Sequence, residues 1–357
     1  MQSVNSKILD EITGHSVDLL RVDAGLRKKV LKELRNLEKT LIKELRAADL
    51  DLRRGRKGRM RALLKQTKAT IASAYAEIDL IEDDSLLKLA RIAEVQAVSS
   101  INSAIKVSAL STGMSQEMLE SIAKNTLIEG APSAEWWTKQ GVDSASKFAN
   151  MVRQGVMRGV VTEDLVREWS GTKESRYLDG VVSQRYRAAE ALVRTSVQVV
   201  ANEARLQTYA NNDDIVKGIE WVSTFDSRTS TTCRALDSLQ WDNDRQPIGH
   251  AKIFPGATAH WNCRSTQVSV LKSWEELGAK GKFKEIPKST RSSMDGQVSG
   301  GMNYESWLES KPEDFQKEVL GAGKWKLWKK GKLGFTDMVD QTGNELSLEQ
   351  LNNKLNK

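Results

Sequence analysis

The strongest constraint on how this chain can fold is the uneven placement of its prolines and aromatic residues. None of its five prolines and only one of its 21 aromatic residues, Tyr75, precedes residue 132. Aromatic side chains supply much of the core area of small β-rich domains, and turn-rich folds need proline and glycine. Residues 1–131 are therefore poorly equipped for a β-sandwich or barrel, and we expect them to be helical.

The length of 357 residues allows two or three domains, each with a sizeable core. The longest charge-free stretches, 95–105 and 253–263, are eleven residues each, whereas a membrane-spanning helix needs about 20 apolar residues. We therefore expect no membrane span. The first residues lack the apolar core of a secretory signal. Two cysteines form at most one disulfide, which is too few to stabilise a chain this long, so a reducing cytosol is the simplest compartment.

One segment accounts for the positive charge of the chain. The net charge is +7, and residues 53–68 hold eight basic side chains and no acid. Such a cluster suits a polyanion, because each lysine or arginine that meets a phosphate releases condensed counterions. A solvated surface and a contact with an acidic protein are the alternatives. We expect sequence-independent contact with double-stranded DNA through Arg53, Arg54, Arg56, Lys57, Arg59, Arg61, Lys65 and Lys68.

Apolar periodicity predicts long helices before residue 130. Apolar residues follow a three-four spacing from Leu26 to Ala48, which is typical of an amphipathic helix. Gly55 and Gly58 interrupt helical propensity, so the basic run is expected at a helix end or hinge. A second helix is expected over 63–81. The acidic residues that follow it, with Ser85, predict the start of a third helix.

The composition changes at Pro132, and shorter elements are expected from there. An amphipathic stretch through Phe148 predicts a helix that ends at Gly155 or Gly159, with a new start at Thr162. Another helix is expected from Val182 to Ala204. Residues 218–225 alternate apolar and polar side chains, as a half-buried strand does, and short strands are expected up to residue 271.

Together these patterns predict a mainly α protein with long N-terminal amphipathic helices, a small α+β motif domain and a short helical C-terminal segment. The expected parts are a helical region over 1–130, a small helical linker domain over 131–180 and the α+β domain over 181–275. A flexible arm, which includes the glycine-rich segment 296–301, and a helical segment are expected over 276–357.

Residues that could bind a metal or act in catalysis are most concentrated between positions 226 and 264, where both cysteines and two of the three histidines lie. Cys233, His260 and Cys263 offer two thiolates and an imidazole for zinc, with His250 or an aspartate as a fourth ligand. The first half of this pattern has one cysteine instead of a Cys-x-x-Cys pair, so the spacing supports a metal only in part.

Two other interpretations use the same residues. The first is nucleophilic catalysis by Cys233 or Cys263, with His260 as base and Asp226 as the group that orients it. The second is structural: the cysteines pack as small hydrophobic residues, and Asp226 forms a charge pair with Arg228. We prefer the structural interpretation and expect no required cofactor, with zinc as the alternative.

An ordered series of short segments runs through the second half of the chain: 194–195, 201–205, Tyr209, 220–229, 233–237 and 260–266, followed by 304–308, 315–321, 331–333 and 346–351. This series resembles the phage head morphogenesis family, the Mu F-like minor head proteins of tailed bacteriophages. Ser196 stands where members commonly carry glutamate, and residues 256–259 stand where a Pro-Pro pair is usual. The resemblance covers about residues 130–357 and assigns a structural motif role to Asp226, Arg228, Thr229, Cys233, Asp237, His260, Cys263 and Arg264.

The resemblance implies a minor, non-enzymatic head protein of a tailed phage. It implies a place inside the virion head after assembly in the host cytoplasm, association with the portal protein, and contacts with the major capsid or scaffolding protein. It also implies a role in head assembly and, in some members, DNA binding and genome delivery. The alternatives are a metal- or cysteine-dependent enzyme carried in the virion and a transient scaffold-like assembly factor.

Overall fold

Long helices dominate the computed structural model, which describes residues 4–105, 108, 110–273, 275–277 and 290–355. The chain divides into two compact units. Unit 1 comprises residues 1–19, 89–119 and 198–357, and unit 2 comprises residues 20–88 and 120–197. The predicted mainly α fold class is confirmed. The domain boundaries at residues 130, 180 and 275 stay predictions.

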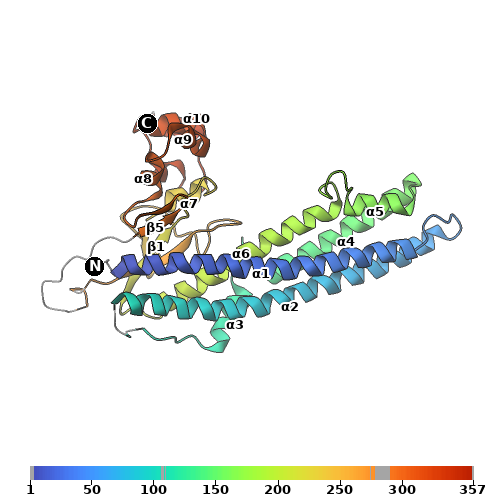
Figure 1. Ribbon diagram of the computed structural model, residues 1–357, viewed down its shortest axis with the longest axis horizontal. Coiled ribbons are helices and arrows are strands. Elements are labelled where there is room, and N and C mark those ends of the chain that lie inside the picture. Colours follow the sequence, from blue (N-terminus) through green and yellow to red (C-terminus); the bar gives the residue numbers. More distant parts are fainter. Residues whose placement is uncertain (1–3, 106–107, 109, 274, 278–289, 356–357) are drawn as a thin grey trace. The chain divides into compact units, whose positions relative to one another are not determined.

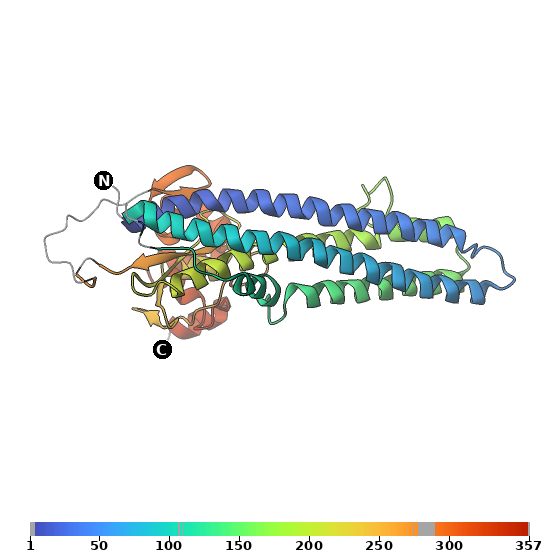
Figure 2. The ribbon, with the colours of Figure 1, turned by 90° about the horizontal axis from the view of Figure 1, so that it is seen from below.

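Unit 2 is built from parts of long helices that run side by side (Figures 1 and 2). Side-chain hydrogen bonds join neighbouring helices, for example between Tyr75 and Ser144 and between Lys147 and Gln184. The helices that contribute residues to this unit are α1 (Val4–Ala47), α2 (Arg56–Ile105), α3 (Gln116–Asn125), α4 (Ser133–Arg158), α5 (Thr162–Ser170) and α6 (Val181–Ala210).

Helix α1 confirms the amphipathic pattern expected from Leu26 onwards. Its apolar stripe is buried, which removes this apolar area from water and stabilises the helix against its neighbours. The buried residues of the stripe are Leu26, Val30, Leu34, Leu37, Leu41 and Leu45.

Helix α2 corrects the prediction of a helix start near Ser85. It is one continuous helix from Arg56 to Ile105, because no glycine or proline interrupts residues 59–105. The Ser85 hydroxyl donates to the Ile81 carbonyl 2.8 Å away, inside the helix, and therefore caps nothing. The acidic residue Glu82 faces the interior of unit 2, where it is fully buried.

The predicted breaks after residue 130 are confirmed in part. Helix α4 ends at Gly159, whose φ of 75° is the left-handed conformation common at helix ends, and α5 begins at Thr162. Gly155, by contrast, lies inside α4. A Cβ atom at Gly155 would approach the Leu165 side chain to 2.1 Å, so this glycine permits close packing of α4 against α5.

A buried carboxyl lies in the core of unit 2. The indole N–H of Trp137 donates to Glu82 at 2.7 Å, and the hydroxyls of Ser133 and Ser196 also hydrogen-bond this carboxyl. Burial raises the pKa of Glu82 to about 7, against the hydrogen bonds, which favour the ionised form. Trp137 also packs against Tyr75 with a ring separation of 6.3 Å.

Unit 1 contains a small antiparallel sheet in the strand order β3-β2-β1-β4. The strand predicted at 218–225 corresponds to β1 (Val216–Val222), and the sheet is completed by β2 (Gln240–Asp242), β3 (Pro247–Ile248) and β4 (Thr266–Leu271). Gly218 is required here, because a Cβ atom at this position would lie 2.3 Å from the Trp241 carbonyl on the paired strand. A short helix, α7 (Thr231–Leu236), joins β1 to β2.

The C-terminal residues of unit 1 pack around Phe225, just after β1. Figure 1 shows α8 near the sheet and α7, with α9 and α10 beyond it. The buried residues of this aromatic core are Phe225, Tyr304, Trp307, Leu308, Leu320, Trp328, Phe335 and Met338. The elements are the hairpin of β5 (Thr290–Ser293) and β6 (Gly296–Ser299), then α8 (Tyr304–Glu309), α9 (Glu313–Leu320), α10 (Ala322–Lys329), η1 (Phe335–Met338) and α11 (Leu348–Leu355).

The glycine-rich segment 296–301 differs from the expected flexible arm, because it begins with strand β6, which pairs with β5. Residues 278–289 of that predicted arm lie outside the described residues. Within the part of the chain that is described, no helix combines the length and the apolar character needed to cross a bilayer.

The buried carboxyl of Glu82 predicts a pH-dependent stability. Its folded pKa of about 7 exceeds the unfolded value of 4.5, so its contribution is fully present below pH 4.5 and is lost as the pH rises to 7. Glu82→Gln removes this loss. Between pH 5 and pH 8, the free energy of unfolding of the variant should rise by on the order of 3 kcal/mol relative to that of the unchanged protein. Urea denaturation followed by circular dichroism measures this difference.

Glu77→Gln serves as the control for this measurement, because Glu77 is exposed on the same helix. It should show the same stability difference from the unchanged protein at both pH values. An equal effect of Glu82→Gln at pH 5 and pH 8 would contradict the assignment of a raised pKa to Glu82.

Candidate functional site

The structure brings together the three residues considered as zinc ligands. Cys233 lies on α7, and His260 and Cys263 lie on the segment between β3 and β4. The Cys233 sulfur is 3.6 Å from the Cys263 sulfur and 3.2 Å from His260 Nε2, and all three ligand atoms lie within 4.8 Å of one another. Both cysteines are buried, with exposed fractions of 2% and 1%.

Hydrogen bonds fix the orientation of the His260 ring. Its Nδ1 lies 2.8 Å from the Trp261 carbonyl, which can only accept, so Nδ1 carries the proton. Its Nε2 faces the Cys233 sulfur and lies 2.7 Å from the Ser230 hydroxyl oxygen. The Ser230 oxygen also caps α7 by accepting from the Cys233 backbone N–H at 3.1 Å.

The two thiols share a hydrogen bond, which lowers the pKa of Cys233 and raises that of Cys263. The hydrogen bond from Cys263, together with the hydroxyls of Ser230 and Ser265, favours the thiolate form of Cys233. The cluster thus has the donor atoms of a soft-metal site.

His250, one of the residues considered as a fourth ligand, is engaged elsewhere. Its Nε2 contacts the Gln240 carbonyl at 2.7 Å, and its Nδ1 accepts from the Lys252 backbone N–H at 3.1 Å. Its ring packs against Trp241 at a centroid separation of 4.8 Å. The hypothesis that His250 completes the cluster is therefore wrong.

Asp226 forms its shortest charge pair with Arg264, and the predicted pair with Arg228 is present as a longer contact. The two guanidinium NH groups of Arg264 donate to the two Asp226 oxygens at 2.6 and 2.8 Å, which is a bidentate pair. The Arg228 guanidinium is 3.8 Å away, and its side chain is 81% exposed. Burial raises the pKa of Asp226, but the hydrogen bonds and charge of Arg264, with a bond from Thr229, outweigh it and leave this pKa lowered.

This pairing does not match the catalytic triad considered from the sequence, in which Asp226 would orient His260. Asp226 is bound to Arg264, whereas the His260 nitrogen that would need an orienting carboxylate contacts a backbone carbonyl. Among the described residues, the cysteine and the histidine are therefore adjacent without the third member that nucleophilic catalysis of this kind uses.

The other motif residues hold the C-terminal segment onto the sheet. Asp237 accepts from the backbone N–H groups of Ser223 and Tyr304, both at 2.8 Å. The Tyr304 hydroxyl donates to the Asp226 carbonyl at 2.6 Å. Arg234 donates to the Val319 carbonyl at 2.8 Å. Tyr304 and Arg234 were not identified as site residues from the sequence, and the signal that was available is their position in segments of the resemblance.

A second buried network anchors the segment between β3 and β4 to α6. The Asn202 side-chain amide donates to the carbonyls of Ala257 and Ser265 at 2.7 and 3.0 Å. Arg205, which is fully buried, donates to the side chains of Asn202 and Thr266 at 3.1 and 3.2 Å. Buried hydrogen bonds of this kind favour one arrangement of an irregular segment.

The basic run lies at the turn between α1 and α2, in unit 2. Arg59 serves the turn itself, because its guanidinium donates to the carbonyls of Asp49, Leu52 and Arg54. Arg56 is half-buried and donates to the Val160 carbonyl at 3.4 Å. The remaining six are exposed, and no described acid lies within ion-pair distance of them: Arg53, Arg54, Lys57, Arg61, Lys65 and Lys68.

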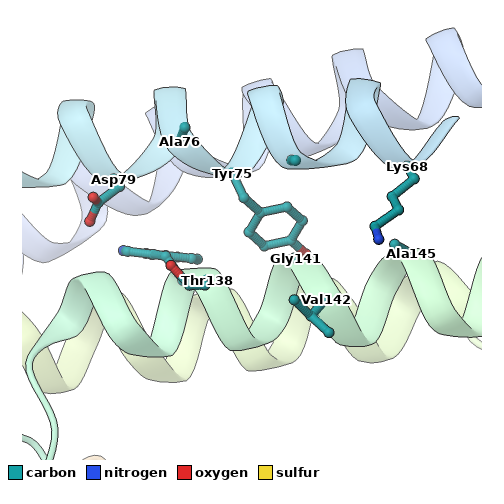
Figure 3. Close-up of a pocket in the computed structure, with 10 residues that line it drawn as sticks. Lys68, Tyr75, Ala76, Asp79, Thr138, Gly141, Val142 and Ala145 are labelled. Atoms are coloured by element: carbon teal, nitrogen blue, oxygen red, sulfur yellow. The ribbon is translucent and has the colours of Figure 1, made fainter. Parts of the chain in front are cut away.

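A cleft of about 330 Å³ lies between α2 and α4 in unit 2 (Figure 3). Tyr75 points from α2 toward Gly141 of α4, and Lys68 and Asp79 lie at opposite ends of the cleft. A Cβ atom at Gly141 would approach the Tyr75 ring to 3.3 Å, so this glycine makes room for the tyrosine. The ten lining residues are mostly apolar and include no cysteine or histidine.

The structure combines a helical bundle with a small α+β domain whose polar motif residues hold segments together. The family described as Phage Mu protein F like protein matches residues 146–268, about a third of the chain. The resemblance to the phage head morphogenesis family is thereby confirmed, and these residues belong to a Mu F-like region that includes Asp226, Cys233, His260, Cys263 and Arg264.

The match implies a phage head morphogenesis protein, in a family of structural head proteins. It also suggests a virion location and capsid-associated partners. No significant match was found among curated proteins or among solved structures.

The bidentate pair predicts unequal effects of two arginine substitutions. Arg264→Ala leaves Asp226 partly buried without its counter-charge, so it should destabilise the protein by on the order of 2–3 kcal/mol. Arg228→Ala removes an exposed side chain and should cost less than about 0.5 kcal/mol. Chemical denaturation followed by tryptophan fluorescence compares them, and equal costs would argue against the pair.

Proposed function

We propose that this protein is a minor component of a tailed-phage head that associates with the portal protein and contacts packaged DNA through the α1–α2 turn. The observation that carries the DNA contact is the set of six exposed basic side chains at this turn, which have no described acid within ion-pair distance. The Mu F-like region supports the head assignment.

The spacing of four of these side chains supports binding to a polyanion. Lys57, Arg61, Lys65 and Lys68 follow one another by four, four and three residues on α2, so they lie on one face of the helix. Successive positions are then separated by about 4.5–6 Å along the helix axis. Such a row can meet several phosphates of one duplex without reading its bases.

The Mu F-like region suits a contact with the portal or with capsid and scaffolding proteins. Its motif residues are occupied in holding the sheet, α7 and the C-terminal segment together. A rigid surface of this kind suits assembly contacts, because little conformational freedom is lost on binding. Delivery of the protein with the genome is compatible with a low-copy protein that contacts DNA.

The exposed basic residues predict salt-dependent binding to duplex DNA. Replacement of Arg53, Arg54, Lys57, Arg61, Lys65 and Lys68 by glutamine should weaken binding about tenfold or more. It should also reduce the slope of log affinity against log salt by about 0.9 for each phosphate that is no longer neutralised. Fluorescence anisotropy with two unrelated duplexes at several salt concentrations measures both quantities.

A control variant carries the same change in charge in the same unit. It replaces six basic residues that are exposed on α1: Lys28, Lys29, Lys32, Arg35, Lys39 and Lys43. Its affinity should fall less than that of the turn variant, and its salt slope should change less. If both variants lose affinity equally, the binding reflects net charge, and the proposed role of the turn is wrong.

The proposed place in the head predicts that the protein remains in finished particles. Quantitative mass spectrometry of purified mature virions should find it at a fixed, low ratio to the portal protein, and chemical cross-linking in the same particles should join it to that protein. Its absence from mature virions, together with its presence in precursor heads, would instead identify a transient scaffold-like factor.

A further inference from the structure

The segment between β3 and β4 is irregular but partly buried, so specific contacts must hold it in place. Residues 249–265 form neither helix nor strand over 17 residues, although Ala257, Cys263 and Ser265 are buried. Irregular segments longer than about 12–15 residues are uncommon inside compact domains unless function or a cross-link maintains them. Asn202 fastens the segment at Ala257 and Ser265. The stretch between these two points carries His260 and Cys263.

The distances within the Cys233–His260–Cys263 cluster fit a tetrahedral ion. Zinc bonds of about 2.3 Å to sulfur and about 2.0 Å to nitrogen place two sulfurs about 3.8 Å apart and a sulfur and a nitrogen about 3.5 Å apart. The observed separations are 3.6 Å between the sulfurs and 3.2 Å between the Cys233 sulfur and His260 Nε2. A disulfide requires sulfurs about 2.05 Å apart. Two of the three separations are thus close to those of ligands around a zinc ion, and all three ligand atoms lie within 4.8 Å of one another.

The surroundings of the cluster also match those of a metal site. The His260 Nδ1 proton bonds the Trp261 carbonyl, which fixes the tautomer that presents Nε2 to an ion. The hydroxyls of Ser230 and Ser265 hydrogen-bond the Cys233 sulfur, and the Ala259 backbone hydrogen-bonds the Cys263 sulfur. Such bonds orient thiolate ligands and stabilise their charge.

We propose that Cys233, His260 and Cys263 bind one Zn²⁺ ion, which fastens the segment 249–265 to helix α7. Binding forms two Zn–S bonds and one Zn–N bond and releases two thiol protons to the solvent. Two thiolates neutralise the dication. The ion would take the place of the Ser230 hydroxyl as the partner of His260 Nε2, with a water as the fourth ligand.

Thiolate and imidazole ligands favour Zn²⁺ over Mg²⁺ and Ca²⁺ at this cluster. Soft sulfur ligands disfavour Mg²⁺ and Ca²⁺, which take oxygen ligands, and a tetrahedral arrangement of two sulfurs and one nitrogen is typical of zinc. The role is structural, because the ligands join two segments that are otherwise linked in this region by hydrogen bonds and the Asp226–Arg264 pair.

Elemental analysis of the purified full-length protein tests this site. The protein is produced with zinc in the medium and purified under reducing conditions without chelators. It should contain about one zinc per chain, and Cys263→Ser and His260→Gln should each lower this value about tenfold or more. The control is His250→Gln, a histidine of the same domain outside the cluster, which should retain the metal.

A second measurement does not depend on the folding of variants. The unmodified protein, stripped of zinc and loaded with Co²⁺, should show the visible absorption of a tetrahedral ion and a charge-transfer band from thiolate ligands. Absence of zinc together with absence of these bands would overturn the proposal, as would a Cys233–Cys263 disulfide under reducing conditions. Because the basic turn contains no ligand, loss of DNA binding by the turn variant leaves this result unaffected.

Discussion

The bidentate pair between Asp226 and Arg264 is the interaction on which the arrangement of unit 1 depends. It fixes the end of the irregular segment 249–265 to the turn that follows β1. The backbone carbonyl of the same aspartate accepts from Tyr304, at the start of the C-terminal helices. Three segments that are remote in sequence thus meet at one residue. Because the pair is largely removed from water, loss of either partner leaves a costly charge.

Unit 2 solves a different physical problem, that of aligning long helices. Its apolar stripe on α1 would allow several helix registers, whereas polar contacts such as Glu82 with Trp137 and Tyr75 with Ser144 are satisfied in one register only. The raised pKa of Glu82 indicates that this specificity comes with a desolvation cost. The division of roles between a motif-rich unit and a charged helical turn is consistent with the proposed function.

The sequence was sufficient to predict the elements but not their long-range partners. The spacing of Leu26, Val30 and Leu34 predicts α1 because helix periodicity is local. The same local reasoning misplaced a helix start at Ser85, since the charge of Glu82 is accommodated by Trp137, 55 residues away. Likewise, proximity in sequence identified Arg228, whose guanidinium lies 3.8 Å from Asp226, but not Arg264, 38 residues away, which binds both carboxylate oxygens. The gathering of Cys233 with His260 and Cys263 was anticipated from residue type alone.

The turn between α1 and α2 has one further consequence, which follows from Arg59. Its guanidinium binds three backbone carbonyls and so holds the loop in one conformation before any ligand arrives. A flexible basic loop would lose conformational entropy on meeting a polyanion, and that loss would offset part of the electrostatic gain. One arginine of the basic run thus acts as an internal brace, which keeps its neighbours pre-organised for contact.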